Sequence, residues 1–389
     1  MSDYRTRDQL LVGVIESPAG TEGAPTTASN AIKTRAITYA PQFEQLDTNY
    51  VQSSLSESAP QTGGGNAQMM VPLWLKGAGT PGQAPDWGVL ARAAAMSQTL
   101  LAVAATGTAQ AGATGSITLA SGASAVDQAY VGMPITITAG TGAGQTVVTS
   151  AYNGTSKVAS VVPNWTVTPS TDSEYSIPAN ALYRPVSSGL ELATFWGYQH
   201  RNSGDSRRRR LMAAAANMTL GITPRQLVDM SFALTGLLPA APDDVTKPAA
   251  PVYQESAPRP FIGAQAYLGG AAVKFSEVQF DLGNDVQMFD DPAAAFGYGP
   301  GATIQRRSTG RIVPNLTLVS SRNAFQDWLS STPRSLWLRW GSTAGERVSL
   351  WLPAIQYTGH EEVDVRGFAA EGLPFRSVEP DAEIFMCIH

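Results

Sequence analysis

The residue types that most often catalyse reactions or bind metals are scarce in this chain. It has one cysteine, Cys387, and three histidines, His200, His360 and His389. A hydrolytic triad needs a histidine beside a serine or cysteine and an acid, and a zinc cluster needs about four Cys or His ligands. His200 lies in a polar stretch expected to form a surface hairpin, and the last residue, His389, is expected to be frayed. These residues predict neither a catalytic centre nor a zinc site.

Three further patterns superficially resemble ligand sites. His360 begins the sequence HEEVD, which lacks the second histidine that metalloproteases use, so we expect a solvated turn. The glycine-rich stretches GAGTPG and GTGAGQT lack the Gly-Lys-Ser/Thr ending of a phosphate-binding loop and predict turns. Segment 280–291, FDLGNDVQMFDD, holds four aspartates at a spacing unlike that of a calcium loop. We therefore expect no enzyme activity, no cofactor and no metal.

One basic cluster stands out, formed by Arg207, Arg208, Arg209 and Arg210. In an extended strand these side chains would point alternately to two faces. They could contact DNA phosphates or an acidic surface of a partner subunit. The chain carries 26 basic and 31 acidic residues, a net charge of −5, which argues against a general nucleic-acid-binding face. Subunit contact is therefore the favoured interpretation.

The elements that would position these residues are mostly strands. A length of 389 residues corresponds to two or three domains. The 37 glycines and 26 prolines favour turns over long helices, and eight tryptophans suit sandwich cores and interfaces. No uncharged apolar run reaches the roughly 18 residues of a membrane span, and the first residues lack the apolar region of a secretory signal. We therefore expect no membrane span.

Residues 102–182 differ in composition from the rest of the chain. They are rich in Ala, Gly, Ser and Thr and contain four charged residues, Asp127, Lys157, Asp172 and Glu174. Such a stretch could be a flexible linker or a small β module. Apolar and polar residues alternate between turn signals, which favours the β module. Its expected core comprises Ile135, Ile137, Val147, Val158, Val161, Trp165 and Tyr175.

The parts outside this insert resemble each other in their order of elements. Each begins with an alternating strand, continues with a strand carrying a Val-Pro step, and then has a helical pattern followed by three strands. The corresponding segments are 32–46, 67–77 and 84–100 in the first half and 272–286, 310–320 and 320–331 in the second. The second helix would place Phe325, Trp328 and Leu329 on one face, with Ser321 as N-cap. The expected fold is mainly β: two tandem antiparallel sandwich or barrel domains, each with one packed helix, plus a small inserted all-β domain.

Three segments carry a family resemblance. VPLWLKGAGTPGQAPDWGVLARAAAM (71–96), RRRRLMAAAANMTLGITPRQLVDMSFALTGL (207–237) and FSEVQFDLGNDVQ (275–287) resemble stretches of the tail tube proteins of long-tailed bacteriophages. The helix end departs from the family, because Ala95-Met96 stands where a small residue or Cys followed by Gly is usual. The insert resembles a β module that recurs in phage structural proteins.

The resemblance implies a major tail protein of the virion, made in the host cytoplasm, that assembles with itself. Six tube domains form a ring, so two per chain imply a trimeric ring with pseudo-sixfold symmetry. Stacked rings form a hollow tube through which double-stranded DNA passes without specific binding, and other tail proteins bind the tube ends. The expected parts are an N-terminal arm (1–31), a first tube domain (32–101 and 183–238), the inserted module (102–182), a Pro-rich connector (239–262) and a second tube domain with a C-terminal tail (263–389).

Assembly would depend on surface residues. The loop 45–67 is too long for a tight hairpin and carries Leu46, Tyr50, Val51 and Leu55, which we expect to contact other subunits or rings. Arg207–Arg210 are expected at subunit seams or on the exterior, and Glu44, Glu277 and Asp281 in an acidic lumen. Two other functions remain open, a carbohydrate-binding β-sandwich adhesin and a tail-associated depolymerase.

Overall fold

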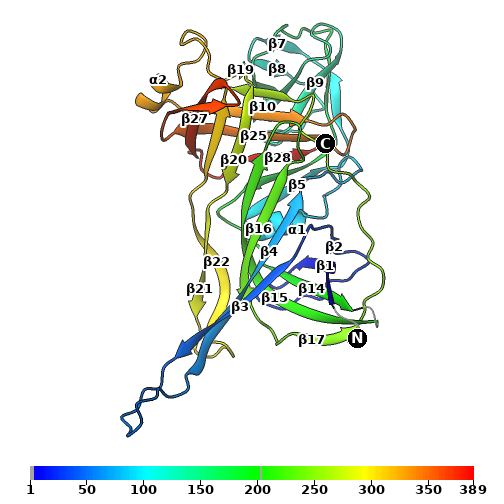
Figure 1. The fold of residues 1–389 in the computed structure, drawn as a ribbon. Coiled ribbons are helices and arrows are strands. Elements are labelled where there is room, and N and C mark those ends of the chain that lie inside the picture. Colours follow the sequence, from blue (N-terminus) through cyan, green and yellow to red (C-terminus); the bar gives the residue numbers. More distant parts are fainter. Residues whose placement is uncertain (1–3, 202–203) are drawn as a thin grey trace.

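The computed structural model describes residues 4–201 and 204–389, and in them strands dominate (Figure 1). The strands form antiparallel sheets, and the described residues contain two short helices, α1 (Gly88–Ala93) and α2 (Ala324–Leu329). The expectation of a mainly β fold of antiparallel sheets is confirmed. None of the helices in the described part of the chain is long and apolar enough to span a membrane.

The first half of the chain supplies one side of a large sheet. Its strands are adjacent in the order β3, β4, β16, β15, and their bounds are Thr38–Leu46, Gln61–Trp74, Asp229–Leu237 and Asp205–Ile222. Alternate residues of β4 and β16 are buried, among them Val71 and Phe232, while Gln68 and Ser231 lie on the opposite, polar face. The two-residue alternation of the sequence therefore becomes one apolar and one polar sheet face.

The second half repeats this arrangement. Its strands are adjacent in the order β20, β23, β27 and β25, with β26 continuing β25 along the same edge of β27 and β24 on the far side of β25. The bounds are Phe275–Asp281, Thr309–Pro314, Phe368–Ser377, Val348–Tyr357, Glu361–Val365 and Arg334–Trp340. Leu373 and Phe375 of β27 join the same hydrophobic core as Val71 and Phe232 of the first half.

The two halves meet edge to edge. The last four residues of β15 pair with β20 in antiparallel register, from Thr219 opposite Asp281 to Ile222 opposite Val278. A second connection runs through β13 (Asn180–Pro185), which pairs with β5 (Met96–Leu101) on one side and β28 (Phe385–Ile388) on the other. The large sheet is therefore continuous across both halves of the chain.

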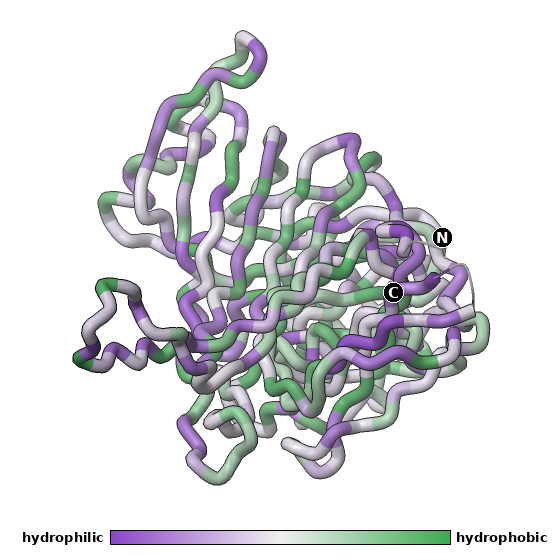
Figure 2. The backbone as a smooth tube through the Cα atoms, turned by 60° about the horizontal axis from the view of Figure 1, so that its bottom comes forward, coloured by the Kyte–Doolittle hydropathy of each residue, from purple (hydrophilic) through white to green (hydrophobic). Residues whose placement is uncertain are grey.

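Shorter strands extend the large sheet at its margins. At the end of the molecule opposite α2, β1 pairs with β14 and β2, and β17 pairs with β15. Near α2, β18 pairs with β24 and β19. Their bounds are Tyr4–Ile15, Ala193–Arg201, Ala31–Ile32, Asp243–Thr246, Gln265–Leu268 and Ala271–Ala272 for β1, β14, β2, β17, β18 and β19. Figure 2 shows hydrophobic positions interspersed with hydrophilic ones along the strands of the molecule's centre.

The insert folds as strands rather than as a linker. Its seven-stranded sheet has the order β6, β12, β9, β10, β11, β8, β7. The bounds are Ala105–Thr108, Glu174–Ile177, Pro134–Ala139, Thr146–Asn153, Val158–Val162, Ser116–Thr118 and Ala111–Ala113. Its core residues, including Tyr152 and Trp165, continue into Trp337, Trp351 and Phe385 of the second half. The module therefore packs against the large sheet.

The first helix is shorter than predicted. The pattern 84–100 predicts a helix throughout, but α1 ends at Ala93, and Ala95 adopts a positive φ of 57°. Residues 96–101 form β5 instead, because they pair with β13 over six positions, from Met96 opposite Pro185 to Leu101 opposite Asn180. Long-range pairing here overrides the local helical pattern.

Two histidines expected at the surface are buried. His200 is 6% exposed, and its ring Nδ1 lies 2.7 Å from the Ser206 hydroxyl, because β14 and β15 pack these residues together. His389 is 2% exposed and hydrogen-bonds through its backbone to Arg347. The expectations of an exposed His200 and a frayed His389 are therefore wrong. Burial lowers the pKa of both rings, and for His389 the nearby Arg339 and Arg347 lower it further.

The burial of His389 predicts an acid-sensitive fold. The pKa of its ring is well below 6.5 when folded and returns toward 6.5 on unfolding, so protons bind the unfolded chain more tightly. This contribution is complete above about pH 6.5 and is lost on acidification, at about 1.4 kcal/mol per pH unit while the folded ring stays neutral. We expect His389→Gln to lose less free energy of unfolding than the parent between pH 7 and 5, measured by urea titration. Equal losses would contradict this assignment, since His200 is common to both proteins.

Candidate assembly surfaces

A long hairpin arm projects from the body of the molecule. It consists of the distal parts of β3 and β4, paired as far as Leu46 opposite Gln61, and a tip loop of residues 47–60 (Figure 1). The side chains of Tyr50, Val51 and Leu55 are 75%, 108% and 106% exposed. Side-chain hydrogen bonds within the tip are local, such as Thr48 to the Ala59 carbonyl oxygen. The apolar residues singled out in this loop therefore point into solvent, at the end of a paired hairpin.

A second arm lies beside the first and was not predicted. β21 (Asn284–Asp290) and β22 (Tyr298–Arg306) form a two-stranded sheet closed by residues 291–297. Phe296 at its turn packs edge-on against Phe43 of the first arm, at 5.5 Å between ring centroids, and its carbonyl oxygen accepts a hydrogen bond from the Gly65 amide. The pattern 272–286 predicts a single strand, because the local signal does not reveal the return strand β22.

The proposed lumenal acids lie in two different places. Glu44 is on the first arm, where its carboxylate accepts a hydrogen bond from the Tyr298 hydroxyl at 3.1 Å and thereby raises the pKa of that tyrosine. Glu277 and Asp281 lie on the polar face of β20, where Asp281 accepts a hydrogen bond from the Asn217 amide. The same face carries ion pairs such as Arg311 with Glu361. It is therefore mixed in charge within one chain, and the acidic lumen remains a prediction.

The arginine run lies on β15 and engages partners within this chain. The Arg208 guanidinium donates two hydrogen bonds to Asp243, at 2.6 and 3.1 Å, and stacks over the Trp196 ring. These bonds raise the pKa of Arg208 and lower that of Asp243. Arg210 lies 3.6 Å from Glu22, whereas Arg207 is exposed. Because β17 brings Asp243 opposite Arg208, half of the run serves intrachain packing, and Arg207 and Arg209 remain the candidates for seam contacts.

Two strand edges lie open at opposite ends of the large sheet. Within the described part of the chain, β3 pairs with β4 alone and β26 pairs with β27 alone. In the first half the end of β15 pairs with β16, and in the second half β26 pairs with β27. β26 is therefore the counterpart of the end of β15. Unpaired edges expose backbone N–H and C=O groups that can pair with another chain.

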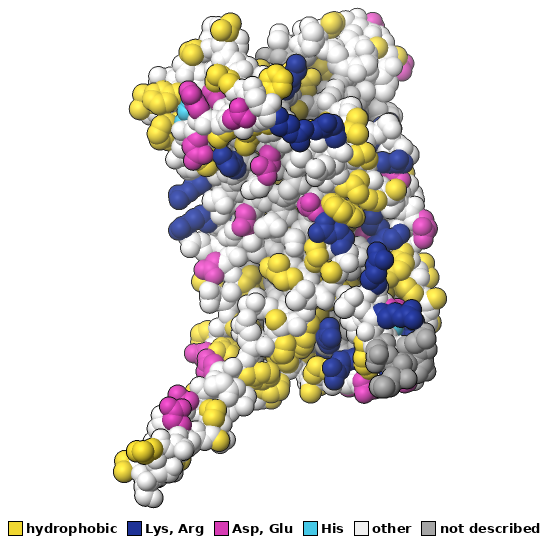
Figure 3. Space-filling model, viewed as in Figure 1, with side chains coloured by type: hydrophobic (Ala, Val, Ile, Leu, Met, Phe, Trp, Pro, Cys, Tyr) yellow, Lys and Arg dark blue, Asp and Glu magenta, His cyan; other side chains and the backbone are white. Residues whose placement is uncertain are grey.

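The second helix turns its apolar residues outward. Phe325, Trp328 and Leu329 are 53%, 38% and 67% exposed, whereas the buried face of α2 holds Ala324 and Asp327. The expectation that these three residues pack inward is wrong, because Arg334 holds Asp327 on the inner side of the helix instead. The expected N-cap Ser321 is also wrong, since the Asn323 side chain accepts the hydrogen bond from the Gln326 amide. Exposed hydrophobic side chains lie on several parts of the surface in Figure 3, and one group of them lies at this end of the molecule. This group also includes Leu316, Leu318, Val319 and Phe368.

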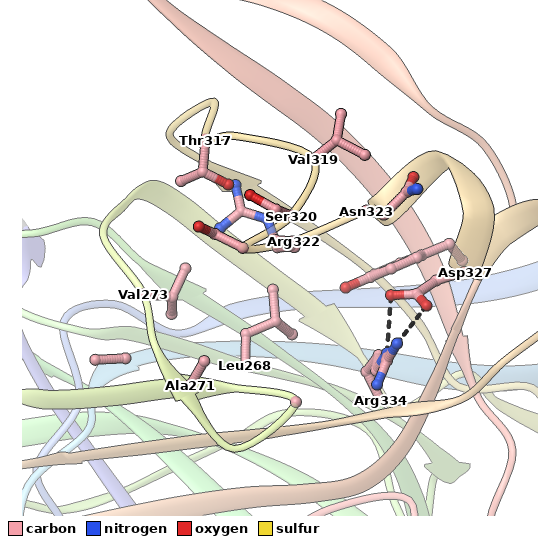
Figure 4. A pocket seen from close by; sticks show the side chains of 14 residues that line it. Leu268, Ala271, Val273, Thr317, Val319, Ser320, Arg322, Asn323, Asp327 and Arg334 are labelled. Carbon is pink, nitrogen blue, oxygen red and sulfur yellow. Dashed lines mark hydrogen bonds and ion pairs between the residues drawn. The ribbon is translucent and has the colours of Figure 1, made fainter.

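A cavity of about 370 Å³ lies beside α2 (Figure 4). Leu268, Val273 and Val319 supply apolar walls, and the Asp327–Arg334 ion pair closes one side. Two buried polar atoms that line it, the Tyr357 hydroxyl and the Thr317 Oγ1, have no hydrogen-bond partner among the described residues. We call this cavity and the exposed apolar residues of 316–329 the α2 groove. Its sequence signal is the apolar run LTLV after Asn315, which belongs to the segment 310–320 that the pattern predicts as a strand.

The remaining candidate residues are those that could be ligands of a metal ion. Among the described residues, no three His, Cys, Asp or Glu side chains are grouped so as to hold a metal ion. His360 is half-buried and lies 3.2 Å from Glu371, which also pairs with Arg322. This histidine was expected in a solvated turn and instead lies within hydrogen-bonding distance of the buried Glu371, beside the Arg322–Glu371 ion pair. Comparison with known proteins gives no further guidance, since neither a family model nor a curated protein matches this chain.

Proposed function

We propose that this chain is a self-assembling structural subunit of the tail tube of a long-tailed bacteriophage. The observation that carries the proposal is the junction of β15 with β20, which joins two halves of similar element order edge to edge. Each half has a long hairpin followed by a short helix, namely β3–β4 with α1 and the β20–β23 segment with α2.

The same junction can be repeated between copies. In the proposed ring, β26 of one copy pairs with β3 of the next, as β15 pairs with β20 within the chain. This covers both open edges of the sheet, and closed cyclic symmetry limits the number of subunits. Six tube domains, two from each chain, make the ring a trimer with pseudo-sixfold symmetry.

Stacking of the rings uses other surfaces. The exposed tip residues Tyr50, Val51 and Leu55 are proposed to contact other copies, since a solvent-exposed apolar tip gains free energy when a partner covers it. The stacked rings form a hollow conduit for ejected DNA, bound at its ends by other tail proteins. With a net charge of −5 per chain, the tube passes DNA without specific binding.

Assembly of the purified chain tests this function. We expect mass photometry to detect particles of three times the 41.0 kDa subunit mass, and negative-stain microscopy to show hollow filaments at higher concentration. A strictly monomeric protein at all concentrations would contradict the proposal. Binding of glycans by such a monomer would favour the adhesin alternative, and cleavage of a polysaccharide would favour the depolymerase.

A further inference from the structure

We infer that the tip of the β3–β4 arm of one copy occupies the α2 groove of another copy. The inference rests on the proposed self-assembly and adds the surface that receives the arm. It follows from two apolar surfaces of the same chain that residues 4–201 and 204–389 leave uncovered. They lie at opposite ends of the molecule, with the tip at lower left and α2 at upper left in Figure 1.

The α2 groove exposes apolar side chains and contains unsatisfied polar atoms that a partner could cover. The apolar residues of α1 are buried, including Leu90 and Ala91, whereas the corresponding residues of α2, such as Phe325 and Leu329, face solvent. The cavity beside α2 adds two unsatisfied buried polar atoms, on Tyr357 and Thr317. An unpaired buried polar group destabilises the structure that contains it, so an occupant that supplies hydrogen bonds is favoured.

The tip has the matching chemistry. Tyr50, Val51 and Leu55 supply apolar side chains, and the intervening residues are Gln and Ser, whose side chains donate and accept hydrogen bonds. From residue 36 to residue 75 the chain has three acids and no Lys or Arg. The charged residues lining the cavity are held in ion pairs, Arg334 with Asp327 and Arg322 with Glu371. These lining residues therefore offer no free charge, and the cavity suits the uncharged apolar and polar residues 50–56 of the tip.

The tip and the groove are different surfaces at opposite ends of the molecule, and this decides the symmetry of a contact between them. A tip at one end that binds a groove at the other end is a heterologous contact, in which each copy uses a different surface toward each neighbour. Such contacts repeat without limit unless a rotation closes them. In the proposed assembly the tip–groove contact joins copies of neighbouring rings, and there it gives open-ended growth.

Disulfide trapping between two differently tagged chains tests the contact. One chain carries Leu55→Cys and the other Val319→Cys, and the native Cys387 is fully buried, which limits background. We expect oxidation of the mixture to yield at least tenfold more mixed dimer than the control pair of Leu55→Cys with Val126→Cys. Val126 is a suitable control because it is 67% exposed on the inserted module, against 70% for Val319.

The outcomes separate this inference from the proposed function. Rings or tubes that form without the mixed Leu55–Val319 disulfide would overturn the tip–groove contact and leave the tube assembly intact. Cross-linking of Leu55→Cys only to itself, or equally to the control position, would also overturn it. If mass photometry finds only monomers, the proposed function itself fails, and the inference with it.

Discussion

Proline in the open edge strand β26 will prevent ring formation while leaving the subunit folded, provided that it replaces the residue whose N–H points away from β27. Backbone N–H groups of an antiparallel strand point alternately toward its two neighbours. Of the adjacent residues Glu362 and Val363, one therefore directs its N–H outward, toward the strand that would be added. Proline there removes one interchain hydrogen bond and places its ring against the incoming strand.

The expected effect is large for assembly and small for folding. We expect the outward-facing variant to raise the concentration needed for trimers by about a hundredfold or more, which corresponds to about 3 kcal/mol. The other member of the Glu362→Pro and Val363→Pro pair removes a hydrogen bond to β27 and will lower the melting temperature. Mass photometry and thermal unfolding of both variants distinguish them. Trimers of normal affinity from the variant that keeps its melting temperature would show that β26 is not a seam.

Periodicity along the chain was sufficient to predict several central strands of both halves. The alternation in 67–77 and in the segment ending MSFALTGL corresponds to β4 and β16, and the alternating insert forms its own sheet. Each of these signals arises from residues close in sequence, because one sheet face is buried and the other is not. The mainly β class follows from such local patterns alone.

The remaining features depend on residues far apart in sequence. Strand β5 replaces the end of the predicted helix because β13, some eighty residues later, pairs with it. His389 is buried because the last strand, β28, lies between β13 and β25. No pattern within β28 states which strands will flank it. Pairing partners, and with them the burial of individual side chains, therefore lay beyond sequence reasoning.

Of the two candidate surfaces, the tip could be predicted from the sequence, whereas the exposed face of α2 could not. The apolar residues of the tip were recognised because they stand in a polar, irregular loop, where burial within the chain is improbable. Phe325, Trp328 and Leu329 have the spacing of an inward helix face, and periodicity cannot tell which way that face turns. Their exposure follows from Asp327, which Arg334 holds on the inner side of α2.

Replacing the three apolar tip residues by serine will abolish tube growth without destabilising the subunit. Tyr50, Val51 and Leu55 are at least 75% exposed, so Tyr50→Ser, Val51→Ser and Leu55→Ser together leave the folded core unchanged. Substitution is preferable to deleting residues 52–65, because β4 begins at Gln61 and such a deletion would remove paired strand. We expect an unchanged melting temperature, measured by calorimetry, and trimers that no longer form filaments.

The magnitude follows from the surface that the contact would bury. Covering a Val or Leu side chain contributes about 1.5–3 kcal/mol, so losing three apolar side chains raises the concentration needed for filament growth by at least about a hundredfold. A matched triple variant on the inserted module, with Val103, Val126 and Val167 replaced by serine, controls for lost surface hydrophobicity. Filaments of normal length from the tip variant would exclude the arm from stacking. Equal loss of filaments in both variants would assign the effect to general surface hydrophobicity. A loss of filaments in the tip variant alone identifies the arm as the element that joins one copy to the next.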